Sequence, residues 1–326
     1  MCIRDSYNNI SCFSGRHYNY RNRVDFLFCK QGLALRNKKG RLVHVRRCEI
    51  ADERINAIAD EVNSEFIDVD TKTLFGAVIR CADNTSVSFV LNEDSTRLGP
   101  AIEKIKAFNT SADNVTVTYA RPGEMTSEES FAVRGGETLT QSYLGKKFSY
   151  DVQGFFQNNH DVAEKMLAYC VGILQKENTK ESCLLDLYGG VGVFGIAASK
   201  LFRQVLIVES FAKSVEAAKT NIERNNAKNV NVVAANARSL KRMEIPRGRE
   251  LLVITDPPRT GMDPETILHL KELEPAKIIY ISCNPEQLAK DLKKFSGSGY
   301  SIKSAALFDM FPQTKHTEAV FELEQK

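Results

Sequence analysis

The stretch Leu184-Leu185-Asp186-Leu187-Tyr188-Gly189-Gly190-Val191-Gly192-Val193-Phe194-Gly195 decides the fold of this chain. Its apolar start predicts a strand over 183–188, its glycines predict a turn, and a helix is expected over 196–202. Glycines at 190, 192 and 195 form the pattern G-x-G-x-x-G, which lets a ligand approach the backbone closely. Glu209 ends the next predicted strand, where a carboxylate can hold two ribose hydroxyls. These features predict an open α/β sheet that binds a nucleotide-like ligand.

Two ligands fit this turn, because NAD and S-adenosylmethionine share an adenosine whose ribose diol needs a carboxylate in that place. Asp186 favours S-adenosylmethionine, since the pattern D-x-x-x-G-x-G, formed here by residues 186–192, is usual in methyltransferases. The glycine turn alone does not exclude NAD as the ligand.

The chain beyond Ser182 alternates between predicted strands and helices. After strands over 183–188 and 204–208, a helix is expected over 213–225. Further strands are predicted over 230–234, 251–255, 276–281, 300–307 and 318–322. The last two lack a helix between them, so they should pair antiparallel. This rhythm predicts a doubly wound sheet with a terminal hairpin, and we place its domain at residues 150–326.

Residues 21–149 have a different rhythm, with short strands and one or two helices, which predicts an α+β domain. Residues 1–20 are polar and lack periodicity, so we expect an irregular N-terminal segment there. Residues 150–159, YDVQGFFQNN, join the two domains with aromatic side chains interleaved with amides. The two adjacent phenylalanines of this join could also be a simple apolar plug between the domains.

The composition is that of a water-soluble globular protein, since 43% of the 326 residues are hydrophobic and 26% are charged. No run of about 18 apolar residues is present, so no membrane span is expected. The N-terminus lacks the apolar core of a secretory signal, which predicts a cytoplasmic protein. The eight cysteines form no C-x-x-C pair, so we expect free thiols and neither a metal nor an iron–sulfur cluster. We also expect a monomer.

The net charge of +3 is modest, but the charges are unevenly distributed. Between Arg21 and Arg47 there are nine basic residues and one acid, Asp25. The basic residues are Arg21, Arg23, Lys30, Arg36, Lys38, Lys39, Arg41, Arg46 and Arg47. So dense a cluster attracts a polyanion such as RNA by displacing counterions from phosphates, although a solvated strand face would have the same composition.

A second strand end carries Asp256-Pro257-Pro258-Arg259-Thr260-Gly261. The two prolines stiffen the backbone where the strand reaches the ligand-binding edge, and Asp256 lies at the crevice. Enzymes that methylate amines have an aromatic residue after such a D-P-P or N-P-P sequence. Arg259 stands in that place here, which counts against amine methylation and suits a phosphate or a carbonyl group.

A third strand end, Tyr280-Ile281-Ser282-Cys283-Asn284-Pro285, places a cysteine at the same edge. Pro285 is expected to begin a helix, with Asn284 as its cap. The thiol of Cys283 would then lie near free backbone N–H groups and the positive end of a helix, a position that favours the thiolate. Taken alone, this cysteine is more simply a buried structural residue. The neighbouring motifs favour a nucleophile.

Three segments, taken in order, resemble the motifs of the RNA uracil-5-methyltransferase family, which makes 5-methyluridine in tRNA and 23S rRNA. They are residues 256–261, 282–285 and 308–318, the last with the sequence FDMFPQTKHTE. Residues 154–159 and 20–23 resemble further family segments, so the likeness covers most of residues 20–326. It implies a class I methyltransferase sheet, Rossmann-like and doubly wound, with an N-terminal α+β domain that binds RNA.

The chain also departs from the family pattern. Val193 stands where many members have a polar Asn or Thr, so one cofactor contact differs. We expect neither the iron–sulfur cluster of some members nor the small N-terminal β-barrel domain that is common among them.

The resemblance implies the chemistry as well. Cys283 would add to C6 of uracil, which makes C5 nucleophilic toward the methyl group of S-adenosylmethionine, and Glu318 would then remove the C5 proton. The residues that it implies for contacts with S-adenosylmethionine are Gln157, Tyr188, Glu209, Asp256 and, as a weaker candidate, Asn236. The target uridine of the RNA would be flipped out of its stack.

Two other functions stay open at this point. One is an NAD-dependent oxidoreductase built on the same glycine turn, and the other is a non-catalytic RNA-binding protein. Neither of these functions would use Cys283, Glu318 and the D-P-P-R sequence together. The choice between tRNA and rRNA as substrate also stays open.

Overall fold

The computed structural model describes residues 10–121, 123–127, 129–175, 179–246 and 248–325. The chain divides into two compact units. The C-terminal unit contains Asp161–Lys326, Ser142–Ser149 and the residues up to Gly15, and the N-terminal unit contains Arg16–Gln141 and Tyr150–His160. Each unit is described by itself.

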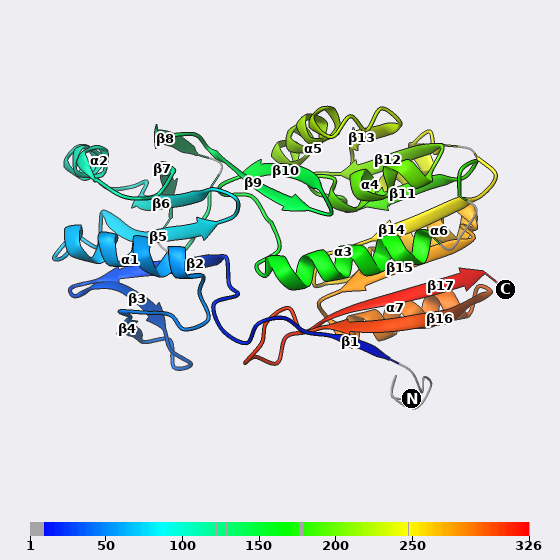
Figure 1. The fold of residues 1–326 in the computed structure, drawn as a ribbon, viewed down its shortest axis with the longest axis horizontal. Coiled ribbons are helices and arrows are strands. Elements are labelled where there is room, and N and C mark those ends of the chain that lie inside the picture. Colours follow the sequence, from blue (N-terminus) through cyan, green and yellow to red (C-terminus); the bar gives the residue numbers. More distant parts are fainter. Residues whose placement is uncertain (1–9, 122, 128, 176–178, 247, 326) are drawn as a thin grey trace. The chain divides into compact units, whose positions relative to one another are not determined.

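The C-terminal unit is built on an eight-stranded sheet in the order β1-β16-β17-β15-β14-β11-β12-β13 (Figure 1). The strands are β1 (Ser11–Phe13), β11 (Cys183–Leu187), β12 (Gln204–Glu209), β13 (Val230–Ala234), β14 (Leu251–Thr255), β15 (Lys277–Ser282), β16 (Tyr300–Phe308) and β17 (Glu318–Gln325). β17 runs antiparallel to both β15 and β16, whereas the other pairs are parallel. The predicted doubly wound sheet with an antiparallel terminal hairpin is confirmed.

Helices cover both faces of this sheet. They are α3 (His160–Gln175), α4 (Val193–Ala198), α5 (Ala212–Arg224), α6 (Pro264–Leu273) and α7 (Pro285–Ser296), with a 3₁₀ turn, η3, at Ala237–Arg242. Side chains of η3, α6 and α7 form one buried apolar cluster with Leu185, Leu187 and other strand residues that point to the same face. The opposite face carries α4, whose Gly195 N–H donates to Asp186 at 2.8 Å.

The start of α7 follows from its sequence. Asn284 is the N-cap and its side chain accepts a hydrogen bond from the Gln287 N–H, while Pro285 is the first helical residue. Proline suits this position because its fixed φ matches a helix and its missing N–H would be unpaired anyway. The predicted cap and helix start are therefore confirmed. Helix α6, which was not predicted from the sequence, begins in the same way with Asp263 as cap and Pro264 as first residue.

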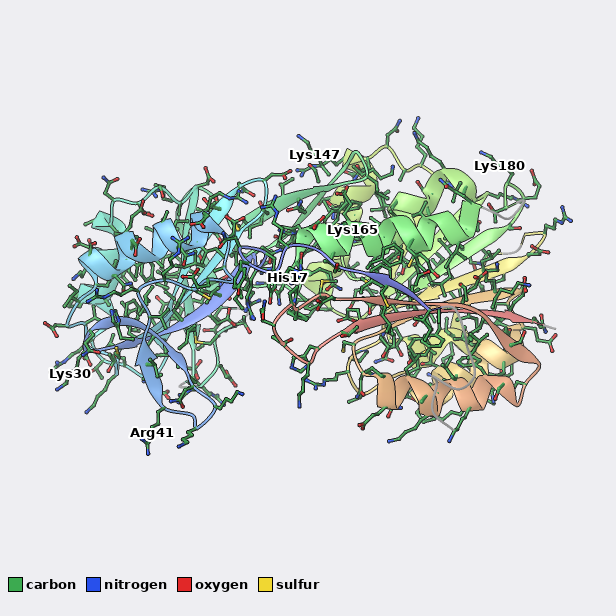
Figure 2. All side chains as sticks on the ribbon, turned by 60° about the horizontal axis from the view of Figure 1, so that its bottom comes forward. His17, Lys30, Arg41, Lys147, Lys165 and Lys180 are labelled. Carbon is green, nitrogen blue, oxygen red and sulfur yellow. The ribbon has the colours of Figure 1, made fainter. Side chains whose placement is uncertain are left out.

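The N-terminal unit contains a seven-stranded sheet in the order β4-β3-β2-β5-β6-β7-β8. Its strands are β2 (Arg23–Cys29), β3 (Gly32–Arg36), β4 (Leu42–His44), β5 (Leu74–Cys81), β6 (Thr85–Asn92), β7 (Asn114–Ala120) and β8 (Ser130–Arg134), and its helices are α1 (Glu53–Glu65) and α2 (Leu98–Ala107). Phe66 packs between Phe89 and Phe108 in the core, with ring centroids 4.7 and 5.1 Å away. The predicted α+β character is confirmed, and Figure 2 shows Lys30 and Arg41 extending from the turns that flank β3.

Two expectations need correction. Residues 1–20 are not irregular throughout, because β1 pairs in parallel with β16 and the Phe13 ring stacks on Phe308 at 4.7 Å. The expected boundary between residues 149 and 150 coincides with a division between the two units, but Ser142–Ser149 belong to the C-terminal unit and Tyr150–His160 to the N-terminal unit. This division falls inside β10 (Lys146–Asp151), which pairs with β9 (Thr138–Tyr143). A three-residue strand and a short hairpin carry too little periodicity to be recognised from sequence.

Candidate active site

The carboxyl ends of three neighbouring parallel strands bring the predicted residues of the C-terminal unit to one edge of the sheet. Tyr188 follows β11, Asp256 follows β14 and Cys283 follows β15. β17 runs the other way, and its Ala319 pairs with Ser282. Glu318 therefore begins β17 beside the point where β15 delivers Cys283. Since neighbouring strands lie about 4.8 Å apart, Glu318, Cys283 and Asp256 form a row along this edge.

Cys283 is partly exposed in the turn between β15 and α7. Burial, and then the nearby carboxyls of Glu318 and Asp256, raise the pKa of its thiol above the ordinary value, although Arg259 acts in the opposite direction. The prediction that this position favours the thiolate is wrong for the protein without RNA. Burial and the two nearby carboxyl groups together outweigh the backbone hydrogen bond and Arg259, which favour the thiolate.

Asp256 and Glu318 are the least compensated carboxyl groups of the site. Within the described residues, neither side chain accepts a hydrogen bond. Burial raises the pKa of Asp256 to about 6. Burial, with a contribution from Asp256, raises the pKa of Glu318 to about 8. A carboxyl group whose pKa lies near neutrality can exchange a proton with a substrate, as a general acid or base must.

The glycine turn after β11 presents open backbone to a ligand. Gly190 has φ +54°, and a Cβ placed on it would meet no atom within 4 Å. Its N–H donates to Glu209 Oε2 at 3.0 Å, while the N–H groups of Ser210 and Phe211 each donate to Glu209 Oε1 at 2.7 Å. These bonds fix the Glu209 carboxylate at the end of β12. Oε2, which accepts only one of these N–H groups, keeps lone-pair capacity for a ribose hydroxyl.

Asp186 lies beneath this turn rather than on its surface. Its buried carboxylate accepts the Gly195 N–H, and burial raises its pKa to about 7 in spite of that bond. The residue therefore joins the first strand to α4, and its contribution to ligand binding comes through the shape of the turn.

Tyr188 and Asn236 flank the turn. Tyr188 has φ +57°, and its half-buried ring packs against the apolar cluster that includes α6. Burial raises the pKa of its hydroxyl. Asn236 is exposed just after β13, and its Oδ1 accepts the Arg238 N–H at 3.0 Å to cap η3. The amide NH₂ of Asn236 makes no hydrogen bond within the described residues, so it is available to a ligand.

Gln157 is the one predicted cofactor residue that belongs to the N-terminal unit. Its backbone is held there by Asn22, whose Nδ2 donates to the Gln157 carbonyl at 2.9 Å. The buried Arg80 binds the same segment, with Nη1 2.8 Å from the Val152 carbonyl and 2.7 Å from the Gly154 carbonyl. The contact between Gln157 and a cofactor stays a prediction.

One residue of this edge, Phe211, was not predicted from the sequence. Phe211 is 41% exposed, and its N–H binds Glu209, so an aromatic ring stands next to the carboxylate that suits a ribose. An aromatic residue two positions after the acid was the available signal. Flat aromatic surfaces suit stacking on a base.

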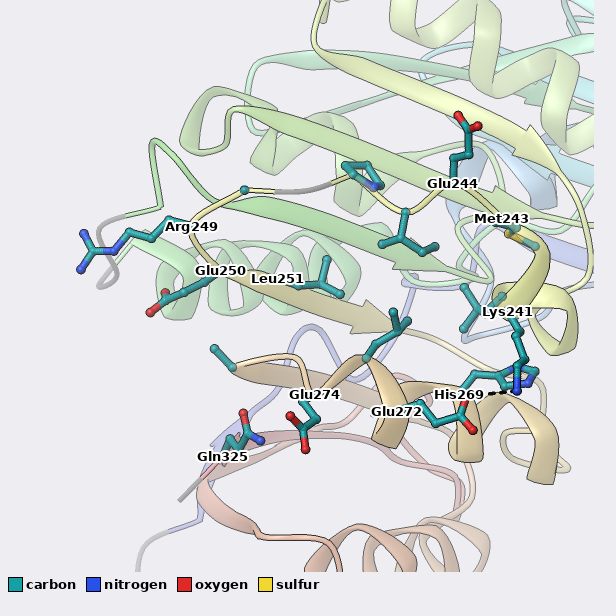
Figure 3. A pocket seen from close by; sticks show the side chains of 16 residues that line it. Lys241, Met243, Glu244, Arg249, Glu250, Leu251, His269, Glu272, Glu274 and Gln325 are labelled. Carbon is teal, nitrogen blue, oxygen red and sulfur yellow. Dashed lines mark ion pairs between the residues drawn. The ribbon is translucent and has the colours of Figure 1, made fainter.

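A cavity lies at the opposite edge of the same sheet (Figure 3). It has a volume of about 1070 Å³ and is lined by residues before β14, by Gln325 of β17 and by α6 residues such as His269 and Glu272. None of the predicted site residues lines it. Across the described residues, no group of three or more His, Cys, Asp or Glu side chains is arranged to hold a metal ion. Among the same residues, no helix combines the length and apolar character that crossing a membrane would need.

The strand order, with β17 as the antiparallel member, and the glycine turn define a class I methyltransferase. A solved structure with the same fold is the tRNA (uracil-54, C5)-methyltransferase of Pyrococcus abyssi, determined in complex with S-adenosyl-L-homocysteine. The two chains superpose with a TM-score of 0.78 at 25% identity, over 96% of this chain and 78% of the other. The predicted fold class is confirmed.

The chain belongs to the tRNA (uracil-5-)-methyltransferase family, whose sequence profile matches residues 136–326. An RNA methyltransferase of Caldanaerobacter subterraneus is 31% identical over 96% of this chain and 74% of its own length. The tRNA (uracil(54)-C(5))-methyltransferase of Saccharomyces cerevisiae is 29% identical over 86% of this chain and 45% of its own length. The protein is therefore an enzyme of the methyltransferase class, which sets aside both the NAD-dependent oxidoreductase and the non-catalytic RNA-binding protein.

Proposed function

We propose that this enzyme methylates C5 of a uridine in tRNA, with S-adenosylmethionine as methyl donor and a covalent bond between Cys283 and C6 of the uracil. The observation that carries the proposal is the pairing of Ser282 with Ala319, which brings Glu318 next to Cys283 on adjacent strands. A nucleophile and a proton acceptor are the two groups that C5 methylation of uracil needs. We propose tRNA rather than rRNA because the matching family profile is described as tRNA (uracil-5-)-methyltransferase, and because the Saccharomyces cerevisiae relative and the Pyrococcus abyssi structure are tRNA methyltransferases.

The residues around the glycine turn fit S-adenosylmethionine. The open backbone at Gly190 leaves room for the ligand, and the Glu209 carboxylate is held where it can accept hydrogen bonds from the ribose diol. The exposed ring of Phe211 and the free amide of Asn236 suit the adenine. Tyr188, Asp256 and Gln157 complete the proposed contacts. When bound, S-adenosylmethionine supplies an electrophilic methyl group.

Cys283 begins the reaction. Its sulfur must first give its proton to solvent and then forms a bond to C6 of the uracil, which breaks the C5–C6 π bond and moves its electron density onto C5 and O4. Carbon 5 is then nucleophilic enough to accept a methyl group. Burial, and then the carboxyl groups of Glu318 and Asp256, raise the pKa of the Cys283 thiol, so these groups oppose the formation of the thiolate.

Glu318 ends the reaction. After methylation C5 carries both a hydrogen and the new methyl group, and the Glu318 carboxylate takes the proton from C5. The C5–C6 double bond forms again as the bond between C6 and the Cys283 sulfur breaks. Glu318 must be ionised for this step, so its pKa of about 8 makes it a strong base for a carboxylate.

We assign RNA binding in part to the basic face between Arg21 and Arg47 in the N-terminal unit. Some of its cations are already used, since Arg23 pairs with Asp25 at 2.8 Å and Arg47 binds Glu53. Others have no acidic partner within the described residues: Lys30, Lys38, Lys39, Arg41 and Arg46. Three of these residues, Lys38, Lys39 and Arg41, lie in the turn between β3 and β4. This turn is held by Asn37 Oδ1, which accepts the N–H groups of Lys39 and Arg41. We infer that this turn contacts RNA phosphates.

The test is methyl transfer from labelled S-adenosylmethionine to unmodified tRNA and, separately, to unmodified rRNA. We expect label in tRNA that is recovered as 5-methyluridine. Label in rRNA alone would show that the substrate is rRNA rather than tRNA. No label in either RNA would contradict the proposed function.

The RNA surface is tested by the triple variant Lys38→Ala, Lys39→Ala, Arg41→Ala. Its affinity for tRNA should fall, and the slope of log K against log salt should decrease by about 3, one for each lost phosphate contact. An unchanged slope would remove the β3–β4 turn from the RNA interface while leaving the chemistry at Cys283 unaffected.

A further inference from the structure

The side chain of Asn284, next to Cys283, makes two hydrogen bonds in different directions. Its Oδ1 accepts the Gln287 N–H at 3.3 Å and so caps α7. Its Nδ2 donates to the carbonyl oxygen of Arg259 at 3.0 Å. The Asn284 N–H also donates to Ser282 Oγ at 3.1 Å, which tightens the turn that carries the cysteine. One residue therefore links the cysteine turn to the loop after β14.

A second contact attaches the far end of the same loop to α7. The fully buried Asp291 accepts the Met262 N–H at 3.2 Å and the Tyr280 hydroxyl at 2.8 Å. Gly261 has φ +80°, and a Cβ on it would lie only 2.5 Å from Asp291 Oδ2, so the loop packs directly on the helix. The loop is thus anchored at Met262 by Asp291 and at Arg259 by Asn284.

The two anchoring residues, Asp291 and Asn284, differ in their distance from the active-site edge of the sheet. Asp291 is buried and lies two turns along α7, so it sets the distance between the loop and the helix. Asn284 lies at the sheet edge itself, where it connects the backbone of Arg259 to the residue that follows Cys283. The exposed guanidinium of Arg259 is close enough to Cys283 to act on the pKa of its thiol, so the two groups are placed to engage one nucleotide.

We infer that Asn284 is a positioning residue that holds Arg259 and the loop after Asp256 in register with Cys283, so that nucleophile and cation engage one flipped uridine. This inference rests on the proposed function. The competing explanation is that Asn284 only caps α7, and a residue with a purely capping role would leave catalysis unchanged when another good cap replaces it.

The Asn284→Ser substitution separates these two roles. Serine caps a helix about as well as asparagine, so the melting temperature should not change. Its side chain is shorter and makes no amide donation to the Arg259 carbonyl, so kcat/KM for tRNA should fall about 10- to 100-fold. The KM for S-adenosylmethionine should stay within about twofold, because the glycine turn and Glu209 are untouched. Full activity of this variant would overturn the inference.

Asn284→Asp provides a second variant in case serine impairs folding. Aspartate has nearly the same shape and caps well, but its second oxygen cannot donate to a carbonyl, so kcat/KM for tRNA must fall here as well. Retained activity in this folded variant would also overturn the inference.

A double-mutant cycle with Arg259→Ala then tests whether Asn284 acts through the loop. If it does, adding Asn284→Ser to Arg259→Ala should reduce kcat/KM by less than about threefold, because the group to be positioned is already gone. Independent losses that multiply would contradict the inference. The wild-type enzyme is assayed in parallel: no methyl transfer by the wild type counts against the proposed function, whereas transfer that Asn284→Ser leaves unchanged counts only against the inference.

Discussion

The two halves of the active-site edge differ in how their carboxyl groups are hydrogen-bonded. At β11 and β12, Asp186 accepts the Gly195 N–H and Glu209 accepts three backbone N–H groups. At β14 and β17, Asp256 and Glu318 accept no hydrogen bond from any residue that the structure describes. The first half is preorganised for binding, while the second half leaves its charges uncompensated.

This difference explains why the chemistry is assigned to the second half. Uncompensated carboxyl groups close together disfavour their own ionisation and that of a neighbouring thiol. Accordingly, Glu318 has a pKa of about 8, and the pKa of Cys283 is raised by burial and by both carboxyls. Raised pKa values of this kind are typical of groups that must exchange protons during a reaction. A contact to a ribose needs only a hydrogen-bond acceptor in a fixed position.

Among the variants that test this difference, Cys283→Ala should have the largest effect on methyl transfer. Loss of the nucleophile should reduce methyl transfer by at least about 10³-fold and abolish any covalent complex with RNA. The affinity for S-adenosylmethionine, measured by calorimetry, should be unchanged because the binding half is intact. Substantial turnover by Cys283→Ala would show that methylation here proceeds without a cysteine adduct.

Glu318→Gln should have the next largest effect. It keeps the size of the side chain but removes the base, so turnover should fall by about 10²- to 10⁴-fold. Steady-state methylation of tRNA measures the loss, and Glu324→Gln, at the far end of the same strand and in a surface ion pair with Lys303, is the control. Rapid normal turnover by Glu318→Gln would remove this residue from the base role.

In the binding half, Glu209→Gln should show the reverse pattern. Weaker hydrogen bonds to the ribose diol should reduce the affinity for S-adenosylmethionine about 10- to 100-fold. At saturating cofactor, kcat should stay close to that of the wild type. If kcat falls while the affinity stays the same, the division of the edge into a binding half and a reacting half is incorrect.

The smallest expected effect is on stability and depends on pH. Glu318 has a higher pKa in the folded protein, about 8, than its ordinary 4.5. Its protonated form is therefore favoured by folding, and this stability is fully present below about pH 4.5 and is lost as the pH rises through 8. Glu318→Gln should escape the loss, so its free energy of unfolding should exceed that of the wild type by about 2–4 kcal/mol at pH 9 and by little at pH 5. Denaturant titrations at the two pH values measure this difference, and equal differences at both would contradict the raised pKa.

Much of the sheet could be predicted from sequence, because buried parallel strands are short apolar runs with clear ends. The strands at 230–234 and 251–255 have the predicted bounds, and Asn284 and Pro285 mark the start of α7 as expected. The hairpin β9–β10 was missed, because its strands are only partly buried and lack a regular alternation. The short strand β1 was missed for a related reason, since its pairing partner β16 lies at the other end of the chain.

The candidate site was harder to predict than the fold. The motifs placed Cys283 and Asp256 at strand ends, but the position of Glu318 beside Cys283 depends on the antiparallel register of β17, which periodicity does not determine. The protonation state of Cys283 was predicted with the wrong sign, because local sequence shows the start of a helix but not two carboxyls brought close by the fold. The bond from Asn284 to the Arg259 carbonyl likewise joins residues 25 positions apart.

The most direct test of the paired roles of Cys283 and Glu318 is to incubate the Glu318→Gln variant with tRNA and S-adenosylmethionine and analyse the product by denaturing gel and peptide mass spectrometry. The proposed mechanism predicts a protein–RNA adduct that accumulates, is joined through the Cys283 sulfur and already carries the new methyl group on the uracil. The same variant that also contains Cys283→Ala should form none. An adduct at another residue, or efficient methylation with no adduct in either variant, would contradict the mechanism.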